Sequence, residues 1–434
     1  MQKKILERLF PLYRTLVSDG TDTALEIIGE YMPSSSSYTV ETYPPLQDAW
    51  TWKIPERYIV HEAYLENENG ERIADFARHP LHIVSYSVPV DAWLSWDELK
   101  SHLFYSVKKP HAIPWEFRYY QRGWGFCLSK EVFDTLPHDI LYHAVIRSEF
   151  ITEPSCGLKV STGIIHPENG RSLDAGEILL CAHVCHPYQA NDDLAGVVTC
   201  IEVARRLERK PLPQGSPSIR FLFCPETIGS ICYLSRHEDL IQTIQAGIFC
   251  EMTGNKNTLI LQRSLQDSHL IDRISRYVLK KMTRVFREDA FREVIVNDEM
   301  VINGPGVGVP CISLSRWPYD EYHTSEDNPD IIEEAMLEEA ADVVEEILRI
   351  YAHNYIPVRK FKGPVFLSRF GLWVDWRENP SLNKEIDNIM IRFEGDHTIF
   401  DIAEELSIDF WEVLAYVDKF LENDLIRKEY QKRD

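Results

Sequence analysis

Short, continuous apolar runs recur in the middle of the chain, and each of them ends at a cluster of polar residues. The four runs are Glu177–Ala182, Ile219–Cys224, Ala246–Cys250 and Val309–Leu314. Runs of this length predict buried strands, and the helical spacing of apolar residues after Gly196 predicts a helix between the first two. We therefore predict an α/β fold, in which the polar residues after the strands meet at the carboxyl edge of the sheet.

The pattern changes in the first third of the chain. In residues 1–44 the apolar residues recur mainly at helical spacing. Residues 45–128 are instead rich in aromatic and β-branched residues, with a predicted turn at Glu68–Glu71. We predict that residues 45–128 form a small β-rich domain inserted into a catalytic domain made of residues 1–44 and 129–355. Its aromatic side chains are either core or, in part, a surface that stacks on a sugar or peptide.

The pattern changes again in residues 360–434, which predict three short helices and a strand, the outline of a winged helix-turn-helix domain. This segment contains 11 basic and 16 acidic residues. A DNA backbone would be repelled by the predicted recognition helix, because Lys419 is its only basic residue. We therefore predict a packing or dimerisation module. The predicted elements are Asn383–Phe393, Thr398–Leu406, Asp409–Asn423 and Asp424–Lys428.

Residues that suit metal binding or acid-base chemistry follow each of the four apolar runs. Imidazole nitrogens and carboxylate oxygens together suit zinc or a similar divalent ion, and a spare carboxylate can act as a general base. The candidates are His183, His186 and Asp192 after the first run, Glu226 after the second, Glu251 after the third and His323 after the fourth.

The order of these motifs resembles that of the co-catalytic zinc aminopeptidases and their glutaminyl cyclase relatives, over roughly Leu141–Asn354. The resemblance implies a three-layer α/β fold with a mixed central sheet, and a site for one or two zinc ions. It also implies a role for five residues of this chain. These are His183, Glu251 and His323 as ligands, Asp192 as the bridging ligand and Glu226 as the base.

Two positions depart from the family pattern. Cys185 stands where the family has the Asp that orients the first His, and Thr227 stands where it has a second Glu. A hydroxyl is a poor substitute for a carboxylate ligand, and His186 is the nearest replacement donor. One metal, or two metals with a rearranged set of ligands, are both possible. The sequence motifs around these residues further resemble those of bacterial aminopeptidase-like proteins of polysaccharide biosynthesis clusters. The substrate of those proteins is not established.

Other polar residues near these motifs have structural or substrate-binding roles in our interpretation. Asp193 either fixes the loop or coordinates a metal, and Asn191 is a candidate cap for the following helix. Glu226 itself is open to a second interpretation, as an ordinary acidic residue in the first turn of a helix. The glycine-rich loop Asn303–Gly308 is expected to border the substrate pocket. The candidate substrate contacts are Asp298, Arg316 and Tyr319.

The predicted reaction is zinc-dependent hydrolysis of an amide or peptide bond next to a free amine, with Glu226 moving the proton from water to the leaving amine. Two alternatives remain open. The first is a non-peptidase amide hydrolase or cyclase in surface-polysaccharide biosynthesis, acting on an aminoacyl or amino-sugar substrate. The second is a pseudoenzyme that keeps the fold as a binding module, which the residues at Cys185 and Thr227 make credible.

The composition of the chain limits which partners it can bind and where in the cell it is expected. The formal charge of −22 argues against nucleic acid or an anionic membrane. The nine cysteines are odd in number, form no Cys-x-x-Cys pair and mostly lie in apolar runs, and Glu7 comes too early for a signal peptide. We therefore expect a cytoplasmic protein, with a homodimer as a reasonable expectation.

Overall fold

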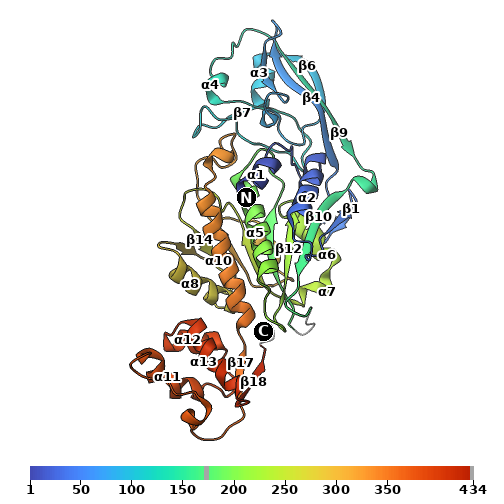
Figure 1. Cartoon of the computed structure of the whole chain (residues 1–434). Helices are drawn as coiled ribbons and strands as arrows, with labels where there is room; N and C mark the ends of the chain where they lie inside the picture. The colour runs from blue at the N-terminus through green and yellow to red at the C-terminus, as the bar shows by residue number, and fades with distance from the viewer. Residues whose placement is uncertain (171–174, 431–434) are drawn as a thin grey trace.

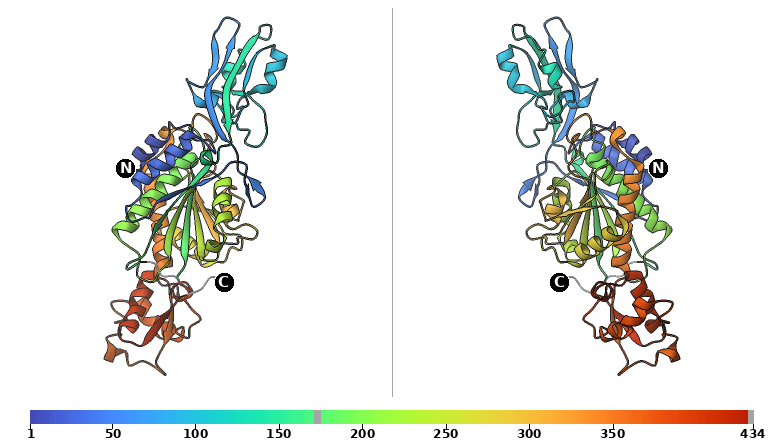
Figure 2. Two further views of the ribbon diagram at one scale, coloured as in Figure 1. Left: turned by 90° about the vertical axis from the view of Figure 1, so that its right-hand side faces the viewer. Right: turned by 90° about the vertical axis from the view of Figure 1, so that its left-hand side faces the viewer.

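The computed structural model of the chain describes residues 1–170 and 175–430. Three parts follow one another along one long axis (Figures 1 and 2). A central α/β part carries a β-rich part at one end and a small helical part at the other. Helices cover both faces of the central sheet, which confirms the predicted α/β class.

The central sheet has eight strands in the order β1-β10-β12-β11-β13-β16-β14-β15. The middle strands β12, β11, β13 and β16 are parallel, whereas β10 is antiparallel to β12 and β14 is antiparallel to β16. The sheet is therefore mixed. Its strands are β1 (Thr39–Tyr43), β10 (Leu158–Ile165), β11 (Glu177–His183), β12 (Ser218–Cys224), β13 (Ile244–Cys250), β14 (Ile260–Gln262), β15 (Arg287–Asp289) and β16 (Cys311–Ser315).

Alternate residues of β11 pack into two separate hydrophobic clusters. Ile178 and Leu180 lie in the cluster formed with α1, α2, α5, α8 and α10, whereas Leu179 and Cys181 lie in the cluster formed with α6, α7 and α9. Because side chains of a strand alternate between faces, each face of the sheet has its own helical layer. The helices are α1 (Gln2–Leu9), α2 (Asp19–Tyr31), α5 (Gly196–Arg209), α6 (Ile228–Arg236), α7 (Glu238–Ile241), α8 (Leu270–Met282), α9 (Asp298–Ile302) and α10 (Glu334–His353).

The β-rich part is built on a four-stranded antiparallel sheet in the order β5-β4-β9-β6. Strand β9 lies beyond Leu128, so this sheet extends past the end predicted for the insertion. The strands are β4 (Arg57–Asn67), β5 (Arg72–Asp75), β6 (Val90–Leu94) and β9 (Tyr142–Ile151), and the shorter elements around them are β2 (Asp48–Ala49), β3 (Trp52–Lys53), α3 (Trp96–Leu99), β7 (Leu103–Phe104), β8 (Phe126–Cys127) and α4 (Lys130–Phe133).

The C-terminal part contains three helices, α11 (Pro380–Ile391), α12 (Ile399–Leu406) and α13 (Phe410–Glu422), close to the three predicted ones. The strand after them, β18 (Ile426–Glu429), pairs antiparallel with β17 (Ile356–Arg359), which precedes all three helices. Ion pairs join this part to α8 of the central part, through Arg273 with Asp401 and Lys281 with Asp409.

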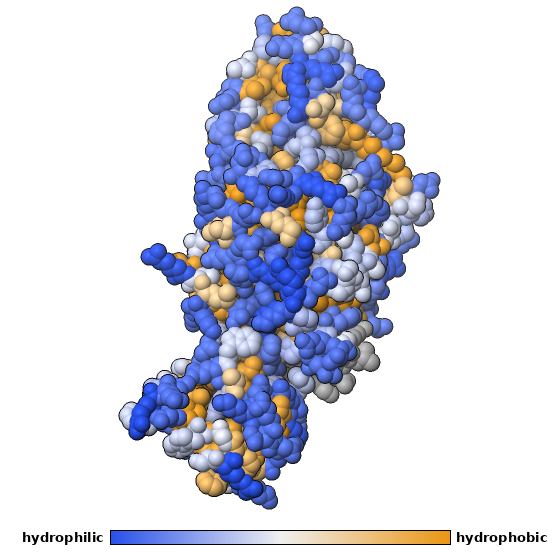
Figure 3. Space-filling view, in the orientation of Figure 1, coloured by the Kyte–Doolittle hydropathy of each residue, from blue (hydrophilic) through white to orange (hydrophobic). Residues whose placement is uncertain are grey.

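Hydrophilic residues dominate the face of the molecule in Figure 3, with apolar residues scattered among them. None of the helices in the described part of the chain is both long enough and apolar enough to cross a membrane.

Candidate metal centre

The predicted ligands come together because neighbouring parallel strands end at one edge of the sheet. His183 is the last residue of β11, Glu226 follows β12 by two residues, and Glu251 follows β13 directly. Asp192 comes from the loop before α5, and His323 comes from the loop after β16. This is the carboxyl edge at which α/β sheets place their sites.

The carboxylate of Asp192 lies at the centre of the group. Its Oδ1 is 3.1 Å from His183 Nε2, and its Oδ2 is 3.2 Å from His323 Nε2 and 3.9 Å from His186 Nε2. The same Nε2 of His183 is 3.8 Å from Glu251 Oε1.

These contacts form two sets of three metal-ligating residues that share Asp192. One set is His183, Asp192 and Glu251, and the other is His186, Asp192 and His323; in each set the ligand atoms lie within 4.8 Å of one another. The second set contains His186, which was the nearest replacement for the missing Glu in the sequence. The described residues therefore offer two candidate ligand sets that share one carboxylate.

Several candidate ligand atoms of the two sets are buried and make no hydrogen bond among the described residues, although some lie at ion-pair distance from one another. They include His183 Nε2, Asp192 Oδ2, His323 Nε2 and both carboxylate oxygens of Glu251. Burying such groups without partners is costly. A divalent cation in each set would satisfy them, and the mixture of imidazole and carboxylate donors fits zinc.

Glu226 lies beside the ligand sets without belonging to either. Its Oε2 is 3.3 Å from His186 Nε2, and its side chain keeps 28% of its surface exposed, whereas those of His183 and Glu251 are fully buried. Burial raises the pKa of Glu226 to about 8. The carboxylate therefore has access both to the centre and to solvent, as a residue that accepts and releases protons requires.

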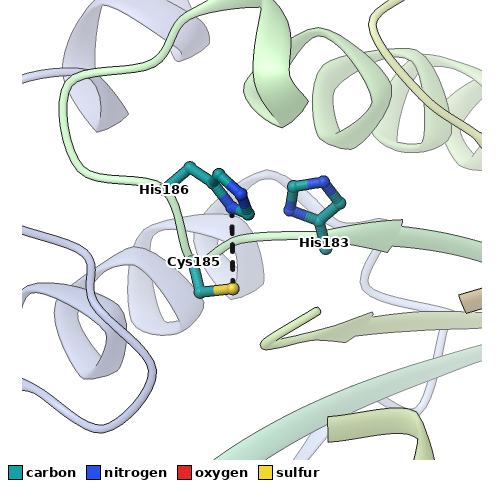
Figure 4. Close-up of side chains that lie close together, drawn as sticks. All are labelled: His183, Cys185 and His186. Carbon is teal, nitrogen blue, oxygen red and sulfur yellow. Dashed lines mark hydrogen bonds between the residues drawn. The ribbon is translucent and has the colours of Figure 1, made fainter. Parts of the chain in front are cut away.

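The two positions that depart from the family pattern have structural contacts. Cys185 lies beneath His183 and His186 (Figure 4), with its Sγ 3.7 Å from His186 Nδ1. The same sulfur accepts a hydrogen bond from the backbone N–H of Glu226 at 2.9 Å. Thr227 has a φ of 60°, and its backbone N–H donates to Asp298 Oδ1 at 3.1 Å. Both positions therefore shape the turn that carries Glu226.

Asp193 and Asn191 support the loop around Asp192. Asp193 accepts hydrogen bonds from the backbone N–H groups of His183, Gly196 and Met252, and so fixes the loop geometry. Asn191 does not cap a helix as expected, because α5 begins only at Gly196. Its Oδ1 instead accepts the backbone N–H of Gly254 at 2.9 Å, which ties this loop to the one after β13.

Asp327 is a supporting residue that the sequence analysis did not single out. Its carboxylate is fully buried and accepts the backbone N–H groups of three consecutive residues, 190 to 192. Tyr319, a predicted substrate contact, donates its hydroxyl to the same carboxylate at 2.7 Å. Asp327 and Tyr319 thus hold the loop of the shared ligand. No spacing in the sequence indicates a contact between segments more than 130 residues apart.

The other two predicted substrate contacts are buried supports as well. Asp298 starts α9 and accepts hydrogen bonds from the Thr227 backbone and the Ser230 hydroxyl. Arg316 donates to the backbone oxygens of Thr253 and Asn257, at 2.9 and 2.6 Å, and pairs with Glu339. The structure brings neither side chain into the cluster of ligands.

The inserted β-rich part contributes directly to the site. The Trp115 backbone N–H donates to the His323 carbonyl at 2.8 Å, and Ser325 and Ile113 exchange two further hydrogen bonds. The indole ring of Trp115 lies edge-on to both His186 and His323, at centroid distances of 4.2 and 4.6 Å. The aromatic surplus of the insertion was the only sequence signal for this contact.

Comparison with known proteins places the chain in a family. A family model described as a domain of unknown function (DUF4910) matches residues 3–354. A protein of Clostridium acetobutylicum named "Putative polysaccharide biosynthesis protein with aminopeptidase-like domain" is 34% identical over 327 residues, which are 75% of this chain and 71% of that protein. The chain therefore belongs to this family of aminopeptidase-like proteins.

Solved structures share the fold. A crystal structure described as a "putative peptidase" from Clostridium acetobutylicum superposes with a TM-score of 0.85 at 28% identity, over 99% of this chain and 96% of that one. The zinc aminopeptidase BSAP from Bacillus subtilis superposes with a TM-score of 0.60 at 16% identity, over 80% of this chain and 93% of that one. The second likeness concerns the fold alone.

Proposed function

We propose that this protein is a zinc-dependent hydrolase that cleaves an amide or peptide bond next to a free amine. The observation that carries the proposal is the pair of ligand sets that share Asp192, with the partly exposed carboxylate of Glu226 beside them. Residues His183 and Glu251 would hold one ion and His186 and His323 the other, with Asp192 common to both. Zinc, when bound, polarises a carbonyl and lowers the pKa of a coordinated water.

The protein's own residues would carry the proton transfers. Glu226 would accept a proton from the attacking water and deliver it to the leaving nitrogen. Its position is held by the Cys185 sulfur through the Glu226 backbone, and by Asp298 through the next residue of the turn. Trp115 would shield the imidazoles of His186 and His323 from water on the side of the insertion.

The first test is metal content. The full chain would be stripped with a chelator, loaded with zinc and freed of excess metal before elemental analysis. We expect two equivalents in the parent and one in His186→Ala, with Glu251→Ala losing the other ion. The loaded parent should release aromatic amines from aminoacyl anilides. A folded parent without zinc would overturn the proposal and favour the alternative of a metal-free binding module.

The second candidate is a non-peptidase amide hydrolase or cyclase in surface-polysaccharide assembly. It is favoured by the name of the 34% identical relative, which includes polysaccharide biosynthesis. Its substrate would be an aminoacyl or amino-sugar compound. Mass spectrometry separates the reactions, because hydrolysis adds the mass of water to the products whereas cyclisation with loss of ammonia does not.

We also propose that the C-terminal part is a winged-helix-like packing module that supports a homodimer rather than binding nucleic acid. The excess of acidic over basic residues in this segment supports the proposal, because a phosphate backbone would be repelled. Sedimentation of the full chain measures the oligomeric state. Titration with duplex DNA should give no binding at physiological salt, and tight binding that weakens steeply with salt would contradict the proposal.

A further inference from the structure

A buried arginine from the N-terminal segment reaches beneath the metal centre. Arg14 lies between α1 and α2, and its side chain is fully buried. Its Nη1 donates to the carbonyl of Val184 at 2.6 Å, and its Nη2 donates to the carbonyl of Gln189 at 3.0 Å. No carboxylate of the described residues lies within ion-pair distance of it. The guanidinium therefore makes its direct hydrogen bonds to backbone.

The two carbonyls lie at the two ends of the segment that carries His186. This ligand differs from His183, which lies in β11 and is fixed by the sheet. His186 lies in a loop, and its neighbours there are the Cys185 sulfur and the edge of Trp115. A planar guanidinium that bonds both ends of the loop fixes the distance between them, which a single hydrogen bond would not do.

Electrostatics favours a geometric role for Arg14 over direct attraction of a metal. Burial lowers the pKa of Arg14 to about 10, so the group stays positively charged at neutral pH, balanced by nearby Asp192 and Asp327. A positive charge next to two divalent cations opposes their binding. Any gain in metal affinity from Arg14 must therefore come from the position that it gives to the loop.

We propose that Arg14 is a positioning residue that holds His186 in the ligand set with Asp192 and His323. The inference rests on the proposed two-zinc function. Without the guanidinium, the segment between Val184 and Gln189 would lose the brace across its ends, and His186 would leave the set. Among the described residues, Arg14 makes no hydrogen bond or ion pair to the side chains of His183, Asp192 or Glu251, and this set would keep its ion because the sheet holds His183.

The experiment measures zinc stoichiometry and affinity in full-length Arg14→Met and Arg14→Lys, by elemental analysis and by competition with a chromophoric chelator. We expect Arg14→Met to retain one zinc, the same result that we expect of His186→Ala. Arg14→Lys keeps the charge but replaces the planar fork, and should bind the second zinc at least tenfold more weakly. In a His186→Ala background, Arg14→Met should change zinc binding no further, because both variants remove the same ligand.

Arg220→Lys is the matched control. Arg220 is also largely buried, but it pairs with Glu177 and lies four residues before the end of β12, about 13 Å from the site edge by strand rise. This variant should retain both ions. Two tightly bound zinc ions in a folded Arg14→Met would overturn the inference. If Arg14→Met does not fold, an Arg14→Lys that binds the second zinc as tightly as the parent overturns it. A parent without zinc would instead contradict the proposed function.

Discussion

The sulfur of Cys185 accepts a hydrogen bond from the backbone N–H of Glu226 at 2.9 Å. This contact joins Cys185, which by the resemblance to the zinc aminopeptidases stands in place of an Asp, to the residue that we propose as the base. The two come from the ends of adjacent parallel strands, β11 and β12. A change in the ligand motif is thereby linked to the position of the base.

Removing this acceptor should lower turnover without removing metal. We expect Cys185→Ala to reduce kcat about tenfold, because the turn of Glu226 would lose one of its two anchors. Cys185→Ser keeps an acceptor and should retain most of the activity. Steady-state kinetics with an aminoacyl anilide, together with zinc analysis, checks the prediction. Equal kcat in both variants would show that the sulfur does not position Glu226.

Glu226→Gln should abolish most of the turnover, because an amide cannot accept the proton from water. We expect a loss of about 10²- to 10⁴-fold in kcat, the range of general base catalysis. Zinc content should stay at two equivalents, since Glu226 belongs to neither ligand set. A variant with full turnover would remove the proposed base role.

A Glu at position 227 should be able to replace His186 as a ligand of the second zinc. His186→Ala is expected to lose one zinc, and adding Thr227→Glu should restore part of the binding, because the resemblance to the zinc aminopeptidases implies a second Glu at position 227. His186→Ala with Thr227→Gln is the matched control, since Gln has nearly the same size but no charge. Elemental analysis of the three proteins would contradict the prediction if the Glu and Gln variants bound zinc alike.

Asp327 should contribute strongly to the stability of the folded protein, although it is not one of the candidate ligands. Asp327→Asn would weaken several hydrogen bonds from the backbone and from Tyr319, and we expect a loss of about 2–3 kcal/mol in the free energy of unfolding. Tyr319→Phe removes one of these bonds and should cost about 1 kcal/mol. Urea unfolding measures both. Equal losses would show that the backbone contacts are not the larger contribution.

Mild acid should destabilise the inserted part through His79. Burial, and to a smaller extent His82, lower the pKa of His79 from its usual 6.5 to about 4. The unfolded chain therefore takes up the proton first, so the stabilisation is complete above pH 6.5 and is lost as the pH falls towards 4. We expect a loss of about 2 kcal/mol between pH 7 and pH 5. His79→Gln should show a smaller loss over this range in urea unfolding.

The sequence predicted the parts of the structure that depend on local patterns. Four apolar runs became β11, β12, β13 and β16, because continuous apolar residues of this length fit only a strand covered on both faces. The positions of His183 and the neighbouring carboxylates at one edge of the sheet then followed from the strand ends. That His186 replaces the missing Glu as a ligand stays a prediction, and the structure places its Nε2 3.9 Å from Asp192 Oδ2.

The residues that support the site could not be predicted from the sequence, because their roles depend on tertiary contacts. Arg14 bonds to residues about 170 positions away, and Asp327 accepts from a loop more than 130 positions away. Arg316 looked available for a substrate, but its guanidinium is used by backbone carbonyls. A charged residue in a loop gives no local signal of whether it faces a ligand or a neighbouring backbone.

The backbone hydrogen bond between the insertion and the His323 loop determines which parts of the protein can be removed or exchanged. The carbonyl of His323, a candidate ligand, accepts a hydrogen bond from the backbone N–H of Trp115. The insertion is therefore part of the wall of the candidate centre. Its removal would take away a structural wall of the centre. The C-terminal part packs on α8 and α10 instead, through the ring contact of Tyr277 with Phe400, the hydrogen bond from Trp411 to Glu346 and ion pairs on α8. A change in the insertion at Trp115 would therefore require a matching change in the loop of His323, whereas the C-terminal part contacts the central part away from this loop (Figure 1).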